Sequence, residues 1–225
     1  MKIVGSLVFF AIFSLAGPGI ALAGPPPGAL TDKDPQAYNG LTSKDIERMK
    51  KGEIIIIKDI GHEESTSKGM IKAALIISQP IDKVYALQAQ DWRQAEYVPY
   101  LEKMWAVQKY ADGNLDEEEL KILFVTLRFR VRWYHEPGKY AFHWNLDPGF
   151  KNDLKRLEGV WQFYYIDDNH TLGRYATVSE TGFGIPQTIQ DFLTRRDLPE
   201  ALNNNKLWFE SMGTWRRPGY KEQTK

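Results

Sequence analysis

Residues 119–134 alternate apolar and polar side chains with few exceptions, and this pattern constrains the fold more than any other part of the chain. Alternation with a period of two is typical of a β-strand that turns one face to the core and the other to solvent. The pattern therefore predicts one long amphipathic strand. Its apolar face carries Leu123, Val125, Leu127, Phe129, Val131 and Trp133, and its polar face carries Thr126, Arg128, Arg130 and Arg132.

Three more strands, rich in aromatic side chains, are expected at 140–146, 156–165 and 171–180. Residues 186–212 then repeat apolar side chains at helical spacing, with Pro186 well placed as the first helical residue and Pro199 as a kink or restart. A curved antiparallel sheet wrapped around one long C-terminal helix usually encloses a cavity, so the main question is what that cavity holds.

The front half of the chain supplies the remaining elements. Thr42 and Asp45 form a capping-box pattern before a short helix at 43–51. Strands are expected at 54–57 and 70–78, and Pro80 opens a helix. A second short helix or turn follows at 91–101, and a strand at 102–110. The sequence thus predicts an α+β fold, with two short helices after the first long strand and a curved antiparallel sheet around a long C-terminal α-helix.

The N-terminus has the features of a secretory signal peptide. Lys2 precedes an apolar run at 3–16, Pro18 interrupts the run, and Ala21-Leu22-Ala23 matches a cleavage site. The alternative is an uncleaved anchor, but the run is shorter than the roughly 20 residues that a spanning helix needs. We therefore expect a signal peptide at 1–23, an exported, periplasmic protein, a flexible proline-rich leader at 24–41, one domain at 42–214 and a disordered tail at 215–225.

Composition excludes several classes of function. The chain has no cysteine, so thiolate catalysis and cysteine-ligated metals are ruled out. Its 29 basic and 29 acidic residues balance, which argues against nucleic acid as a partner. None of the four histidines has metal-ligand spacing with another histidine or a carboxylate, and we expect no metal and no cofactor.

Several local features resemble the START-like (SRPBCC) superfamily, in its polyketide cyclase/dehydrase and lipid-transport branch, which includes coenzyme Q-binding START proteins. These features are Pro80 at the helix start, Asp91-Trp92 at the end of that helix, and the segments 157–161 (LEGVW) and 171–175 (TLGRY) on successive strands. The resemblance covers roughly 53–213. It implies a helix-grip fold with an apolar cavity for a lipid, isoprenoid, sterol or polyketide.

The candidate ligand-binding residues are the large apolar side chains of the inward strand faces and of the C-terminal helix, with one amide on that helix. They are Leu123, Leu127, Trp133, Phe142, Trp144, Trp161, Phe163, Phe192, Asn205, Trp208 and Phe209. Each aromatic ring could instead simply fill the core. Asn205 either meets a ligand or water in the cavity, or belongs to a solvated run with its neighbouring asparagines.

The basic row Arg128, Arg130 and Arg132 is expected on the outer face of the sheet, where Glu158 and Glu180 could pair with it. An alternative is a transient contact of this row with an anionic membrane surface or a partner protein.

Three functions remain open from the sequence. The first is an exported protein that binds a hydrophobic small molecule or lipid. The second is a cyclase or dehydratase that acts on a polyketide-like substrate, which inward carboxylates and histidines would favour. The third is a protein–protein interaction module with a filled core. Because the inward faces inferred here are almost wholly apolar, the first function is preferred.

Overall fold

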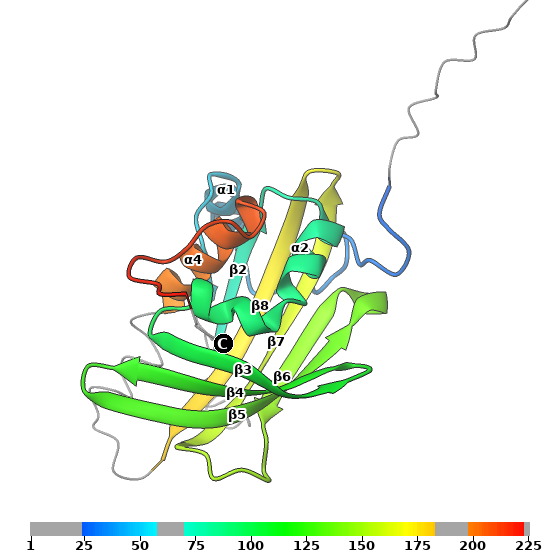
Figure 1. The fold of residues 1–225 in the computed structure, drawn as a ribbon. Coiled ribbons are helices and arrows are strands. Elements are labelled where there is room, and N and C mark those ends of the chain that lie inside the picture. The colour runs from blue at the N-terminus through cyan, green and yellow to red at the C-terminus, as the bar shows by residue number, and fades with distance from the viewer. Residues whose placement is uncertain (1–23, 58–69, 183–197, 223–225) are drawn as a thin grey trace, which may run out of the picture.

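A computed structural model describes residues 24–57, 70–182 and 198–222. Within these residues the chain forms an eight-stranded antiparallel sheet in the order β1-β2-β8-β7-β6-β5-β4-β3, which curls around helices on its inner side (Figure 1). The strands are β1 (Ile55–Ile57), β2 (Ile71–Ile77), β3 (Leu101–Tyr110), β4 (Gly113–Ile122), β5 (Val125–Glu136), β6 (Ala141–Leu146), β7 (Leu154–Asp167) and β8 (His170–Thr181). The expected α+β helix-grip fold is confirmed.

The helices divide between the two faces of the sheet. They are α1 (Ser43–Lys50), α2 (Ile81–Gln88) and α4 (Leu198–Glu210), with short 3₁₀ turns η1 (Asp91–Glu96) and η2 (Pro137–Lys139). Strand alternation explains the division: Ala73, Leu75 and Ile77 of β2 belong to the core cluster with α2 and α4, whereas Ala74 belongs to the cluster with Met49 of α1. No helix in the described ranges is long and apolar enough to cross a membrane.

Local sequence signals set the starts of the helices. The Thr42 hydroxyl accepts a hydrogen bond from the Asp45 backbone amide at 3.2 Å, and the Asp45 carboxylate accepts one from the Thr42 amide at 3.1 Å, so the capping box is confirmed. Pro80 directly precedes α2, and Pro199 lies within α4. The part of the expected C-terminal helix at 186–197 lies outside the described residues, as does the signal peptide.

The prediction of one long strand at 119–134 is wrong, because the chain reverses at Leu123 and Phe124. Ile122 of β4 pairs with Val125 of β5, so the two residues between them form a tight hairpin loop. Leu123 takes a positive φ of 55° and is 71% exposed. No Gly, Pro, Asn or Asp marks this turn, and its apolar residues continue the alternation on either side.

Residues 24–41 are held against the sheet, contrary to the expected flexible leader. Thr31 forms a parallel bridge with Tyr165 of β7, and Arg174 donates hydrogen bonds to the carbonyl oxygens of Ala37 and Asn39 at 2.8 Å. Ala37 is fully buried. The segment is held against the sheet because its apolar side chains join the core cluster that contains Met49 of α1.

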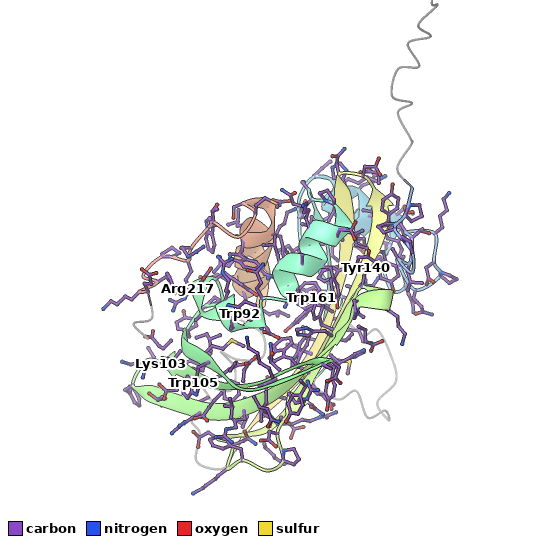
Figure 2. The ribbon with its side chains drawn as sticks, turned by 45° about the vertical axis from the view of Figure 1, so that its right-hand side comes forward. Trp92, Lys103, Trp105, Tyr140, Trp161 and Arg217 are labelled. Atoms are coloured by element: carbon purple, nitrogen blue, oxygen red, sulfur yellow. The ribbon has the colours of Figure 1, made fainter. Side chains whose placement is uncertain are left out.

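The expected disordered tail is also ordered as far as the structure describes it. Arg217 donates to the carbonyl oxygens of Ala95 and Leu101, and Trp215 packs against the main core cluster (Figure 2). These contacts fix the tail beside η1 and the start of β3.

The sheet ends at β1 on one side and at β3 on the other. Strand β3 carries two irregularities in its pairing with β4, between Leu101 and Lys103 and between Ala106 and Gln108. Most of its side chains are exposed, including Trp105 and Val107.

Candidate ligand cavity

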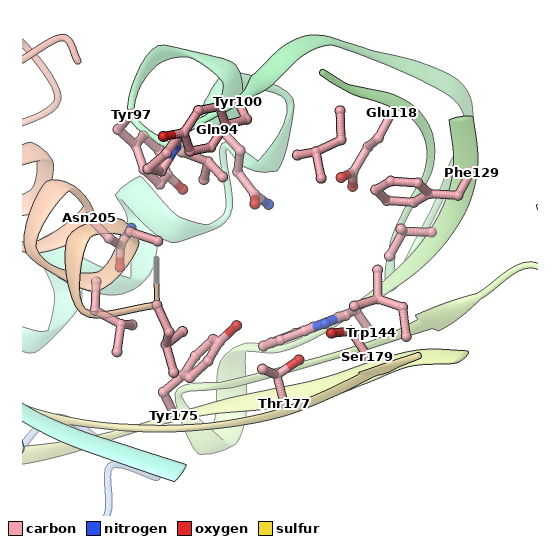
Figure 3. Close-up of a pocket in the computed structure, with 18 of the residues that line it drawn as sticks. Gln94, Tyr97, Tyr100, Glu118, Phe129, Trp144, Tyr175, Thr177, Ser179 and Asn205 are labelled. Atoms are coloured by element: carbon pink, nitrogen blue, oxygen red, sulfur yellow. The ribbon is translucent and has the colours of Figure 1, made fainter. Parts of the chain in front are cut away.

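A cavity of about 230 Å³ lies between the inner face of the sheet and α4, with the segment around η1 closing one side (Figure 3). Its walls come from β4 to β8, from the end of α2, from residues 94–100 and from α4. Protein interiors rarely hold voids much larger than a water molecule. This space corresponds to the liquid volume of about eight waters, so it is a feature of the fold rather than a packing defect.

Four of the predicted ligand-binding residues line this cavity: Trp133, Trp144, Trp161 and Asn205. Five others are buried in the core without lining it, namely Leu127, Phe142, Phe163, Trp208 and Phe209. These five side chains fill the core, which was the alternative to lining a cavity. Phe192 lies outside the described residues. Leu123 is a correction, because the hairpin turn places it on the surface, away from the cavity.

The three tryptophans are held in place by their neighbours on the sheet. Trp133 and Trp144 are directly paired across β5 and β6, with ring centroids 4.9 Å apart, and Trp161 packs on Tyr175 at 4.8 Å. A Cβ atom at Gly159, which pairs with Trp144, would collide with the indole ring. The glycine of the 157–161 segment therefore makes room for a cavity wall.

The cavity also contains polar groups that the sequence reasoning missed. Gln88, Gln94 and Glu118 line it, and Figure 3 shows Gln94 and Glu118 directed into the space while Asn205 reaches it from α4. Gln88 and Asn205 are 2% and 5% exposed, yet the side-chain oxygen of each has no hydrogen-bond partner. Asn205 is thus a buried cavity residue rather than part of a solvated run.

Behind Glu118 lie more acidic side chains. Asp91 is fully buried; it accepts a hydrogen bond from Asn114 Nδ2 at 2.6 Å, and its other oxygen lies 2.8 Å from His135 Nε2. Asp116 is also fully buried, and neither of its carboxyl oxygens has a partner. No group of three or more metal-ligating side chains in the described part of the chain is arranged to hold a metal ion.

Burial changes how these carboxyl groups titrate. Loss of solvent raises the pKa of Asp116 to about 7, with the charge of Asp91 adding to the effect. Burial likewise raises the pKa of Glu118 to about 8, with further contributions from Asp116 and Asp91. Near neutral pH, Glu118 is therefore largely protonated and Asp116 about half protonated.

The inference that the inward faces are almost wholly apolar is therefore wrong. Asn114, Asp116, Glu118, Leu120 and Ile122 alternate along β4, so its inner face is polar at one end and apolar at the other. The signal was present in the sequence, but these acidic residues stand in the unbroken run 116–119, which is more typical of a solvated surface.

The row Arg128, Arg130 and Arg132 lies on the outer face of β5, as expected, but its acidic partners are different. Arg128 and Arg130 both pair with Glu117 of β4, which is 2% exposed, and Arg132 pairs with Asp112. Glu158 and Glu180 pair with Arg156 instead. Antiparallel pairing of β4 with β5 places Glu117 opposite Arg130, which explains the choice.

The curved sheet, the helices on its inner side and the cavity between them define a START-like helix-grip fold. A START superfamily protein from Mycobacterium smegmatis has a TM-score of 0.54 at 14% identity, covering 64% of this chain and 98% of its own. A STAR-related lipid transfer protein fragment from Xanthomonas axonopodis has a TM-score of 0.53 at 11% identity, covering 69% and 98%. A protein from Thermus thermophilus has a TM-score of 0.54 at 16% identity, covering 64% and 96%. No family profile and no curated protein sequence matches the chain. Identities this low establish the fold alone.

Proposed function

We propose that this protein is an exported, periplasmic carrier that holds a hydrophobic small molecule, of the lipid, isoprenoid or polyketide class, between the sheet and α4. The observation that carries the proposal is the cavity itself, whose walls include Trp133, Trp144 and Trp161. Concave sites with mainly apolar and aromatic walls and a few polar groups are the usual form of small-molecule sites. One solved structure of the same fold is named a lipid transfer protein, which agrees with this class of ligand.

Export rests on the N-terminal pattern, namely Lys2, the apolar run and the cleavage signal at 21–23. Mass measurement of the protein from a periplasmic extract tests it. A chain that starts at Gly24 supports export, and a chain that retains residues 1–23 in the cytoplasmic fraction contradicts it.

The binding proposal is tested by native mass spectrometry of the mature protein, purified without detergent and followed by lipid extraction. We expect a stoichiometric apolar ligand. The variant Ala201→Phe fills the cavity from α4, and it should bring the bound fraction to near zero. Leu207→Phe is the matched control, because Leu207 lies on the same helix but is 38% exposed and does not line the cavity. A wild-type protein that stays empty after incubation with total lipid extract would refute the carrier function.

Glu118 supports a second candidate, a cyclase or dehydratase. A carboxyl group with a pKa of about 8 inside an apolar cavity is suited to proton transfer near neutral pH. The test is to incubate the extracted ligand with fresh protein and to look for a change in ligand mass or structure. Conversion that is lost in Glu118→Gln supports the enzyme, and an unchanged ligand supports the carrier. The third function, a protein–protein interaction module, assumed a filled core, and the cavity of about 230 Å³ speaks against that assumption.

A further inference from the structure

We propose that the cavity selects an amphiphile whose polar end donates hydrogen bonds, as a hydroxyl or a protonated amine does, and that it excludes anionic head groups. This inference rests on the proposed binding function and specifies the chemistry of the ligand. It depends on two features of the cavity: its unpartnered polar atoms, and the presence of an acid without a cation among its described lining residues.

The unpartnered atoms come first. The Gln88 side-chain oxygen, at the end of α2, and the Asn205 side-chain oxygen, on α4, are both buried, and neither receives a hydrogen bond. Buried polar atoms in native proteins almost always have partners, and an exception needs an explanation. Both residues line the cavity, so a donor on a bound molecule would satisfy them.

The amide side chains offer partners of both kinds. The Asn205 side-chain oxygen has no hydrogen-bond partner, so it is available as an acceptor. Gln94 offers the complementary group, an unpartnered amide nitrogen. A hydroxyl head group could use both kinds of partner, because it donates and accepts.

The ionisable groups oppose an anion. Glu118, which lines the cavity, would add a second negative charge on losing its proton, and no Lys, Arg or His is among the lining residues within the described ranges. His135 is engaged with Asp91. A carboxylate or phosphate that entered this space would lose its hydration without gaining a cation, which is strongly unfavourable.

The experiment compares three probes with the same ten-carbon chain: decylamine, decanol and decanoate. Each is titrated into the mature protein at pH 7.5, with quenching of tryptophan fluorescence as the readout. We expect decylamine and decanol to bind at least about tenfold more tightly than decanoate. Whichever of the two binds more tightly identifies the head group as an amine or a hydroxyl.

Two variants assign the effect to the polar groups. Glu118 is largely protonated at pH 7.5 and ionises above its pKa of about 8, so Glu118→Gln, which cannot ionise, should reduce the ratio of decylamine to decanoate affinity several-fold at pH 9. Gln88→Met removes an acceptor but keeps side-chain length, and it should weaken decanol. The control is Glu119→Gln, because Glu119 is the next residue of β4 but pairs with Lys103 rather than lining the cavity.

The outcomes separate this inference from the binding function. If decanoate binds as tightly as decanol and decylamine at pH 7.5, or if Glu118→Gln leaves the affinity ratio unchanged at pH 9, head-group selection is wrong and hydrophobic binding stands. If none of the three probes binds and extraction finds no ligand, both proposals fail.

Discussion

Asp116 and Glu118 are carboxyl groups that the fold has removed from water. Both side chains lie on the inner face of β4, where they are buried. Their desolvation is tolerated because a protonated carboxyl is uncharged, so the native state holds protons that the unfolded chain releases in the same pH range. Part of the stability of this protein should therefore depend on pH.

The sign follows from the direction of the two shifts. In the folded protein the pKa values are about 7 for Asp116 and about 8 for Glu118, above the ordinary values of 3.8 and 4.5. The native state binds more protons between these limits, so the stabilisation is complete below pH 4 and is lost as the pH rises to about 8. We expect the free energy of unfolding to fall by a few kcal/mol between pH 5 and pH 8.

Urea unfolding at pH 5, 6, 7 and 8 and constant ionic strength measures this fall. Asp116→Asn should make the fall smaller, because an amide does not titrate and only Glu118 then contributes. A free energy of unfolding that stays level or rises across the range in the wild-type protein would show that these groups are not protonated in the native state.

At the scale of elements, the β4–β5 hairpin brings Glu118 to the wall of the cavity. Leu123 holds a left-handed conformation in its loop, which costs a residue with a branched side chain about 1–2 kcal/mol. Asn adopts this conformation more readily. Leu123→Asn should therefore raise the free energy of unfolding by about 0.5–1 kcal/mol in urea denaturation.

The neighbouring residue provides the control. Phe124 is 86% exposed but is not among the residues with positive φ, so Phe124→Asn should give no such gain. Equal effects of the two substitutions would mean that loss of exposed apolar surface, not backbone conformation, determines the change.

The same hairpin shows what a sequence can and cannot predict. The alternating pattern correctly predicted that Leu127, Phe129, Val131 and Trp133 lie on the inner face. In a strand, the face depends only on whether a residue stands at an odd or an even position. The pattern did not separate Trp133, in the cavity wall, from Leu127, in the solid core. That distinction depends on where the inner face of the curved sheet separates from α2 and α4 and leaves a cavity between them. The turn itself was missed because it lacks the usual turn residues.

At the scale of the whole molecule, both ends of the described chain brace the fold. Arg217 bonds two carbonyl oxygens near η1, and Trp215 packs on the core. Deleting residues 215–225 should lower the free energy of unfolding by about 1–3 kcal/mol, because buried area and hydrogen bonds are lost together.

Thermal unfolding of the truncated protein tests this, with deletion of residues 221–225 as the control. That shorter deletion spares Trp215 and Arg217, so its melting temperature should match that of the full chain. If the long deletion leaves the melting temperature unchanged, the tail contacts contribute nothing to stability.

The sequence predicted a disordered tail because composition does not show long-range contacts. Arg217 donates to backbone carbonyl groups that stand more than a hundred positions earlier in the chain.

The two irregularities in β3 have a consequence for how copies of this protein behave at high concentration. An open sheet edge presents unpaired amides and carbonyls, and it invites another strand to join it and begin an aggregate. Strand β3 is such an edge, and Trp105 and Val107 add exposed apolar surface that would favour association. Its bulges break the straight row of hydrogen-bonding groups, and Lys103 and Lys109 add charge along it. The protein thus keeps an open, curved sheet without offering a regular template for aggregation.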